Sequence, residues 1–157
     1  MNLKYPILYI NVARFSPEKG IKRLVEAFER FRQEKRDTYL FVIGGHGIEF
    51  DEIYQYLLEN ELDNIVLIRS MSNVFPILSK CDVFILSSYY EGLPMSIMEA
   101  LILKKTVVCT DIPGPRDFLR QGYGYLIPDS VEGIYQGFQD SYRSDLNLKE
   151  FDYIKFN

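Results

Sequence analysis

The chain has 157 residues, of which 47% are hydrophobic and 15% aromatic, and a formal net charge of −4. This length is typical of one domain, and so apolar a chain can build a core without disulfides or metal. The acidic balance argues against a nucleic-acid partner, because binding to the phosphate backbone requires a basic face.

Cysteine usage and hydropathy indicate the compartment. Cys81 precedes one predicted strand and Cys109 lies within another, so both are expected to be small buried apolar residues rather than reactive thiols. The sequence shows neither a secretory leader nor a run of about 20 apolar residues that could span a membrane. We therefore expect a cytoplasmic location, with any peripheral contact at the inner face of the membrane made through another part of the protein.

Strand-like and helix-like segments alternate along the chain. Apolar runs predict strands at 7–12, 39–43, 65–68, 82–86, 106–109 and 125–127. Helices are predicted at 19–34, 49–60, from Asn73 to about residue 80, from Pro94, after Pro115 and at 131–142. Short apolar strands between helices indicate a parallel sheet buried on both faces. The fold class expected is α/β, a doubly wound (Rossmann-like) domain with a six-stranded parallel sheet, covering residues 1–157 as one unit.

Chemically interesting residues follow the predicted strands. Doubly wound sheets bind ligands outside the carboxyl ends of their strands. The loops after the first four strands, at 14–19, 44–47, 69–72 and 91–96, carry the cations, glycines and carboxylates of interest. These loops are expected to converge on one cleft.

Two glutamates separated by seven residues flank the start of one predicted helix. Pro94 suits the first helical position, which would leave the amides of Met95 and Ser96 as an anion site at the positive end of the helix dipole. Glu99 shares their face of the helix. Glu91 lies in the loop before the helix. Because a carboxylate would repel a bound phosphate, Glu91 is expected to be directed at hydroxyl groups beside it. The pattern fits a nucleotide-sugar pocket. The alternative is that both glutamates merely complement the dipole or are solvated.

Two cations follow the first strand. Arg14 offers a planar fork and Lys19 a mobile point charge, a suitable pair for a diphosphate. Alternatively, Lys19 is a solvated residue in the first helical turn. A basic residue is unfavourable there, and a bound anion would give its position a reason.

The turn Gly44-Gly45-His46-Gly47 lacks the spacing of a dinucleotide fingerprint and follows the second strand. We interpret it as a turn that lets a ligand approach the backbone, with His46 at its edge rather than as a general base. The sequence contains no phosphate-binding loop of the Walker type, no nucleophile elbow, no His/Cys metal cluster and no Asp-x-Asp pair. A site that needs no metal and no cofactor is expected.

Several motifs, in order, resemble a known family. They are Ala-Arg-Phe-Ser-Pro-Glu-Lys-Gly at 13–20, Val-Ile-Gly-Gly-His-Gly at 42–47, Ser-Asn-Val-Phe-Pro-Ile-Leu at 72–78, Asp-Val-Phe-Ile-Leu-Ser-Ser-Tyr-Tyr-Glu-Gly-Leu-Pro at 82–94, Met-Glu-Ala at 98–100 and Thr-Asp-Ile-Pro-Gly-Pro-Arg at 110–116. Together they resemble the C-terminal domain of glycosyltransferase family four. Members of this family are retaining enzymes of the GT-B fold. The Gly-Gly-His-Gly turn, the Pro-Gly-Pro-Arg segment and the Phe-Asp-Tyr tail are most similar to domains of bacterial teichoic-acid and wall-polymer biosynthesis proteins.

The resemblance implies a role for each site residue. Arg14 and Lys19 would grip the donor diphosphate, Glu99 the ribose hydroxyls and Glu91 the donor sugar. The remaining contacts would come from a backbone segment facing sugar and phosphate, from a segment near the base, and from the glycine turn: Leu93, Pro94, Met95 and Ser96; Arg69, Ser70 and Met71; and Gly45. Pro94 departs from the Gly or Asn of many members and removes one amide, which affects donor preference.

The function implied is donor binding for transfer of a hexosyl-type sugar from a nucleotide sugar, UDP-linked, to a glycan or surface-polymer acceptor. The resemblance places the acceptor in an N-terminal domain that this chain lacks, so the chain alone is expected to be inactive. The rival hypotheses are a catalytically silent nucleotide-binding or interaction domain of the same fold, and an oxidoreductase-type dinucleotide domain, which the broken fingerprint disfavours.

Overall fold

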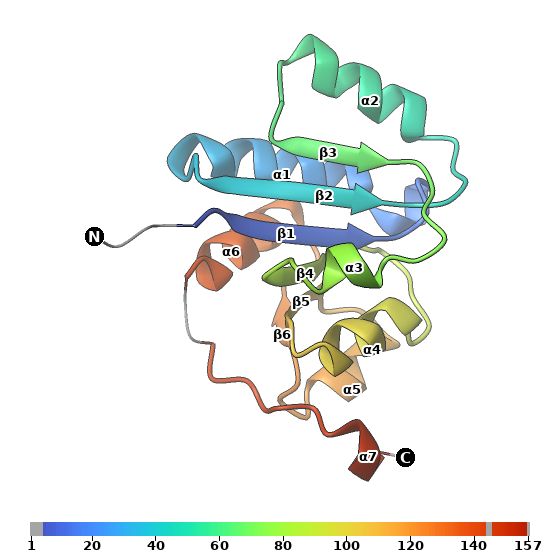
Figure 1. The fold of residues 1–157 in the computed structure, drawn as a ribbon, viewed down its shortest axis with the longest axis vertical. Coiled ribbons are helices and arrows are strands. Elements are labelled where there is room, and N and C mark those ends of the chain that lie inside the picture. The colour runs from blue at the N-terminus through green and yellow to red at the C-terminus, as the bar shows by residue number, and fades with distance from the viewer. Residues whose placement is uncertain (1–4, 144–145, 157) are drawn as a thin grey trace.

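A computed structural model describes residues 5–143 and 146–156. One parallel sheet runs through it in the order β3-β2-β1-β4-β5-β6 (Figure 1). Its strands are β1 (Ile7–Val12), β2 (Thr38–Ile43), β3 (Ile65–Ile68), β4 (Val83–Leu86), β5 (Thr106–Thr110) and β6 (Tyr125–Ile127). The predicted doubly wound six-stranded fold is therefore confirmed, with strand bounds within one residue of those expected.

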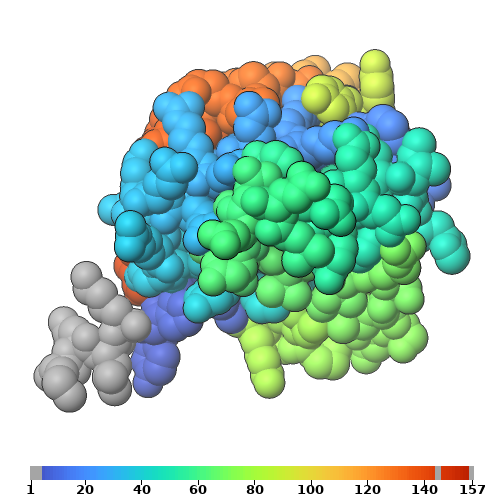
Figure 2. Space-filling view, turned by 90° about the horizontal axis from the view of Figure 1, so that it is seen from above, coloured from blue at the N-terminus to red at the C-terminus, as the bar shows by residue number. Residues whose placement is uncertain are grey.

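Helices cover both faces of the sheet. They are α1 (Ile21–Glu34), α2 (Phe50–Glu59), α3 (Phe75–Leu78), α4 (Met95–Ile102), α5 (Pro115–Leu119), α6 (Val131–Ser141) and α7 (Tyr153–Phe156), with a 3-10 turn, η1 (Pro17–Lys19), before α1. One core lies between the sheet and α1, α2 and α6, and the other lies between the sheet and α3, α4 and α5. Seen from the β3 side, α2 is in the foreground with α1 beside it (Figure 2).

Aromatic packing fixes α1 and α6 on their face. The rings of Tyr9, Phe28, Phe31 and Phe138 meet with centroids 4.9–6.3 Å apart. The Tyr9 hydroxyl, buried in this cluster, donates to the Phe138 carbonyl at 3.0 Å. Such rings contribute about 0.5–1.5 kcal/mol per pair beyond the burial of their area. These contacts hold α1 against β1 and α6, and with it the loop that precedes the helix.

The strand order creates a switch point between β1 and β4. Successive crossovers run outward from β1 to β2 and β3, and then from β4 to β5 and β6. Loops after β1 and β4 therefore leave the sheet in opposite directions, and ligands of doubly wound sheets bind at such a point. Lys19 follows β1 and Glu91 follows β4, so both lie beside this switch point.

Several helix starts differ from the sequence prediction, and α3 begins at Phe75, after the N-cap Val74, rather than at Asn73. The helix predicted from residue 19 begins at Ile21, after η1 and Gly20, whose φ of 64° is left-handed. A Cβ at Gly20 would lie 2.3 Å from the Ser87 carbonyl oxygen, so glycine alone allows this turn. The sequence predicts Pro94 as the first helical residue, but it is the N-cap of α4, with extended backbone at φ −72° and ψ 132°. Because proline fixes only φ, its presence does not distinguish the two positions.

Candidate functional site

A cavity of about 260 Å³ lies at the carboxyl ends of β1, β2 and β3. Its lining residues are Val12, Ala13, Arg14, Ile43, Gly44, Gly45, Ser70, Met71 and Val74. Four residues predicted for the site, Arg14, Gly45, Ser70 and Met71, are thus brought together from three loops. Three of the four loops expected to converge line this cavity, and the loop at 91–96 does not.

The two glycines after β2 have different surroundings. A Cβ on Gly44 would lie 2.2 Å from the Ala13 carbonyl oxygen, so glycine is needed for the loops after β1 and β2 to approach. A Cβ on Gly45 would meet no heavy atom within 4 Å. Gly45 therefore presents bare backbone to open space at the rim of the cavity.

Arg14 lines both this cavity and a second hollow of about 540 Å³, which is also lined by His46 and Arg69. The Arg14 side chain is 67% exposed and only loosely paired, with 3.4 Å between Nη2 and Glu18 Oε1. The Arg69 guanidinium donates to Asp51 at 2.6 Å and lies 4.1 Å from the centroid of the Phe50 ring. Arg69 thus faces the second hollow, apart from Ser70 and Met71. The cavity is slightly smaller than the range of about 300–1,000 Å³ usual for small-molecule sites, and the second hollow falls within that range.

Glu18, the partner of Arg14, is held as a carboxylate. Its pKa is lowered from its ordinary value, first by the hydrogen bond from the Ser16 hydroxyl and then by backbone hydrogen bonding and Arg14. Ser16 also lines the second hollow. Arg14 is therefore neutralised only in part, by a long and exposed contact, and it can turn to a bound anion at small cost.

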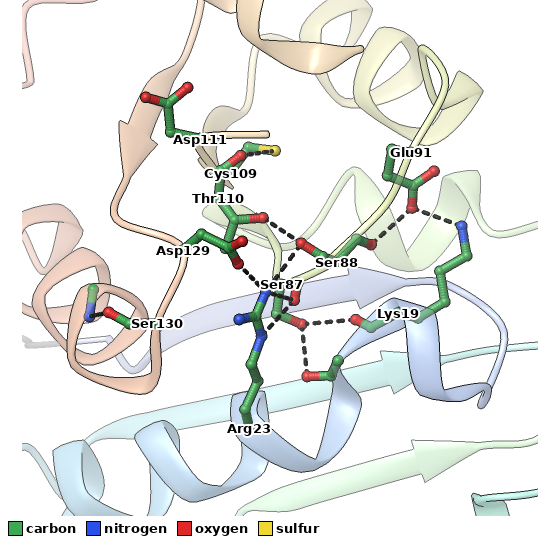
Figure 3. Close-up of polar contacts among 12 residues, drawn as sticks. Lys19, Arg23, Ser87, Ser88, Glu91, Cys109, Thr110, Asp111, Asp129 and Ser130 are labelled. Carbon is green, nitrogen blue, oxygen red and sulfur yellow. Dashed lines mark hydrogen bonds and ion pairs between the residues drawn. The ribbon is translucent and has the colours of Figure 1, made fainter. Parts of the chain in front are cut away.

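Lys19 and Glu91 form an ion pair across the switch point (Figure 3), with 2.6 Å between Nζ and Oε1. Their side chains are 15% and 8% exposed. The Ser88 hydroxyl donates to the same carboxylate oxygen at 2.7 Å. No described residue hydrogen-bonds Glu91 Oε2, which leaves this oxygen free to accept. Lys19, predicted to bind the diphosphate, and Glu91, predicted to bind the sugar, are thus in contact with each other.

The N-terminus of α4 lies beside Glu91. With Pro94 as N-cap and no side chain capping the helix, the amides of Met95 and Ser96 belong to the first turn, where helical amides lack partners. Leu93 is 45% and Met95 71% exposed. Glu99 is partly buried, and among the residues described here its carboxylate has neither a hydrogen bond nor an ion pair. An acceptor without a partner on this helix is available to a ligand.

Arg23 and Ser88 are two further residues at the site that sequence reasoning did not single out. The sequence places Arg23 on an amphipathic helix, yet its side chain is 6% exposed and contacts the end of β4. No local pattern indicates this, because its partners lie 64–106 residues away along the chain.

The cysteines agree with the prediction. Cys81 and Cys109 are both buried and free. Burial raises the pKa of the Cys81 thiol to about 11 and that of Cys109 to about 12.

Within the described ranges, no three His, Cys, Asp or Glu side chains are grouped so that they could hold a metal ion. In the same part of the chain, no helix is both long and apolar enough to cross a membrane.

Comparison with known proteins gives the family. The sequence profile described as Glycosyl transferases group 1 matches residues 2–149. The chain belongs to this family. The teichoic-acid likeness is also supported, because relatives of this group 1 glycosyltransferase domain include wall-polymer biosynthesis glycosyltransferases.

Two curated relatives illustrate the match. The domain is 31% identical over 137 residues to the uncharacterized glycosyltransferase MJ1059 of Methanocaldococcus jannaschii, covering 85% of this chain and 33% of the relative. It is 31% identical over 130 residues to the putative teichuronic acid biosynthesis glycosyltransferase TuaC of Bacillus subtilis, covering 81% and 31%. The chain therefore spans about a third of the length of these relatives.

A solved structure supports the GT-B assignment. A mutant of S. aureus TarM, in complex with fondaparinux, alpha-GlcNAc-glycerol and UDP, superimposes with a TM-score of 0.75 at 27% sequence identity. The match covers 88% of this group 1 chain and 29% of TarM. Fold and sequence motifs thus point to the same family.

Proposed function

We propose that the chain is the donor-binding domain of a retaining glycosyltransferase, which moves a sugar from a UDP-linked donor to a glycan or surface-polymer acceptor. The observation that carries this proposal is the cavity at the ends of β1, β2 and β3, lined by Arg14, Gly45, Ser70 and Met71. The Lys19–Glu91 pair lies at the adjoining switch point. UDP in the TarM complex supports the choice of nucleotide.

In this proposal each part of the donor meets a different group. The base enters the cavity beside Ser70 and Met71, and Glu99 accepts from the ribose hydroxyls. The diphosphate lies between Arg14 and Lys19, near the free amides of α4. Charge that develops on the leaving diphosphate would be stabilised by these fixed cations and amides, so catalysis would be largely electrostatic and would need no metal.

Glu91 has a second role in this arrangement. Its Oε1 holds Lys19 and Ser88, while Oε2 is free to accept from a sugar hydroxyl. Glu91→Ala should therefore reduce the discrimination between a nucleotide sugar and free UDP. A bound diphosphate would share Lys19 with Glu91, since an ammonium group has three donors.

The rival proposal is a catalytically silent domain of the same fold. It is favoured by the burial of Glu91, which is only 8% exposed and already engaged by Lys19. Sugar-transfer activity of a longer protein that contains this domain, measured with wild-type residues and with Lys19→Met, separates the two proposals. The acceptor site is proposed to lie in another domain, so the chain alone should bind donor but transfer essentially no sugar.

Calorimetric titration of the chain with a panel of nucleotides tests the proposal. UDP and UDP-sugars should bind, uridine should bind more weakly, and NAD should not bind. Binding of NAD in preference to UDP would favour the dinucleotide-domain hypothesis. No binding of any nucleotide by the folded chain would refute the proposed function.

A further inference from the structure

Arg23 is a buried cation that the proposed donor contacts do not use. Its guanidinium donates from Nε to the Ser87 carbonyl at 2.9 Å, and from Nη2 to the Ser87 and Ser88 carbonyls at 2.7 and 3.0 Å (Figure 3). Asp129, in the loop between β6 and α6, accepts from Nη2 at 2.6 Å. The ring of Tyr89 lies 3.6 Å from the guanidinium carbon. A buried charge is tolerated only when it is paired and hydrogen-bonded in this way.

The two serines held by Arg23 both contact the Lys19–Glu91 pair. The Ser87 hydroxyl donates to the carbonyls of Lys19 and Gly20 at 3.2 and 3.1 Å, which fixes the main chain of Lys19. The Ser88 hydroxyl donates to Glu91 Oε1, which fixes the carboxylate. The loops carrying the two charges therefore meet at a single dipeptide, and Figure 3 shows this dipeptide between Arg23 and the ion pair.

The Ser88 carbonyl is held from a second side. Thr110, the last residue of β5, donates from its hydroxyl to this carbonyl at 2.7 Å. Tyr89, the next residue, donates its amide to the Glu18 carbonyl at 2.8 Å in η1. The end of β4 is thus fixed to the neighbouring strand and to the turn of Lys19, and Arg23 is the charged group at the centre of these contacts.

We propose that Arg23 is a positioning residue, which sets the relative placement of Lys19 and Glu91 through the carbonyls of Ser87 and Ser88, with Asp129 as its outer anchor. Arg23 itself touches no donor atom. The expected effect of Arg23 on donor binding rests on the proposed function, since misplaced Lys19 and Glu91 would weaken the hold on the diphosphate. The placement of Lys19 and Glu91 by Arg23 does not depend on any ligand.

A conservative substitution separates positioning from simple stabilisation. Arg23→Lys keeps the charge but loses the planar fork, so it cannot bond both carbonyls and Asp129 in the same geometry. Arg30→Lys is the matched control. Arg30 is also on α1, pairs with Glu132 and lies 3.8 Å over the ring of Tyr135, but it is 52% exposed and does not contact Ser87 or Ser88.

The first readout needs no ligand. Lys19 is 15% exposed, so an amine-acetylating reagent followed by peptide mass spectrometry should label it slowly in the wild-type chain. In folded Arg23→Lys, labelling of Lys19 should rise by about tenfold, the effect expected when a hydrogen bond to a charged group is lost. Arg30→Lys should leave the rate unchanged. An unchanged rate in Arg23→Lys, or an equal rise in Arg30→Lys, would overturn the proposal.

The second readout is a double-mutant cycle on UDP affinity. Arg23→Lys should weaken UDP binding by about tenfold in the wild-type chain but have little effect in Lys19→Met, because the two changes act on one contact. Equal losses in both backgrounds would mean that Arg23 acts only on stability. If the wild-type chain does not bind UDP, the proposed function fails, while the labelling result still decides the role of Arg23.

A milder variant covers failure to fold. Asp129→Asn leaves Arg23 in place and removes only the charge of its outer anchor, whose side chain is 41% exposed. Lys19 labelling should then rise in the same direction but less than in Arg23→Lys. If Arg23→Lys does not fold and Asp129→Asn labels at the wild-type rate, the proposal is wrong.

Discussion

Lys19 and Glu91 lie 72 positions apart in sequence, yet Nζ and Oε1 are 2.6 Å apart in the structure. The contact joins the loop after β1 to the loop after β4, across the point where the strand order reverses. The two residues predicted to contact the diphosphate and the sugar therefore form one unit. Substitution of either should change the environment of the other.

The stability of the chain should depend on this pair. Lys19→Met leaves the largely buried Glu91 carboxylate with Ser88 as its remaining described partner, and should lower the free energy of unfolding by about 1.5–3 kcal/mol. Lys22→Met is the control, because Lys22 is 49% exposed and pairs with Glu49 and Glu52, so the cost should be about 0–1 kcal/mol. Urea denaturation measures both. Equal costs would show that the Lys19–Glu91 pair contributes no more than a surface contact.

Glu99 should matter for the ligand and little for the fold. Because the Glu99 carboxylate has no partner within residues 5–143 and 146–156, Glu99→Ala should change stability by less than about 0.5 kcal/mol. The same variant should weaken UDP binding by about 1.5–3 kcal/mol, the range for a hydrogen bond to a charged group. Glu59→Ala, at an exposed position in the last turn of α2, should leave UDP binding unchanged. Wild-type affinity in folded Glu99→Ala would remove Glu99 from the ribose site.

Arg14 should act through the diphosphate alone. Arg14→Ala is expected to weaken binding of UDP but not of uridine, and added salt should reduce UDP affinity less in this variant than in the wild type. Arg36→Ala makes the same change of charge on an exposed residue just before β2, at the opposite end of the strands. It should leave both affinities unaltered. A parallel loss for UDP and uridine in Arg14→Ala would mean that Arg14 supports the loop rather than the phosphates.

The buried thiols predict a loss of stability at alkaline pH. In the unfolded chain they ionise near the ordinary pKa of 9.0, whereas burial raises the folded pKa to about 11 for Cys81 and about 12 for Cys109. The folded state therefore holds more protons above pH 9, and its stability should fall as pH rises, on the order of 1 kcal/mol per thiol at pH 10. Denaturation of the wild type and Cys81→Ala at pH 8 and pH 10 measures this. An identical pH dependence in the two chains would contradict it.

The strands were predictable because their signal is local. Runs such as Val83-Phe-Ile-Leu86 are apolar throughout and bounded by polar residues, as a strand covered on both faces requires. The loops of the site followed from the strands, since ligands bind at the carboxyl ends of doubly wound sheets. Arg14, Gly45, Ser70 and Met71 were therefore expected in one cleft, and the cavity brings them together.

The contacts between loops were not predictable in the same way. The Lys19–Glu91 and Arg23–Asp129 pairs join residues 72 and 106 positions apart, and their register depends on how β1, β4 and β6 are placed in the sheet. Pro94 shows the limit of local signals, because its φ suits both the N-cap it occupies and the first helical position predicted for it.

In the proposed function, UDP binds at the carboxyl edge of β1–β4. Amide chemical-shift mapping of the isotope-labelled chain, titrated with UDP, tests this placement. We predict that the amides that shift are those of Arg14, Gly45, Ser70, Met95 and Ser96, while those lining the hollow between α1 and α2, such as Val25 and Ile53, do not shift. Shifts confined to that hollow, or none at saturating UDP, would contradict the account.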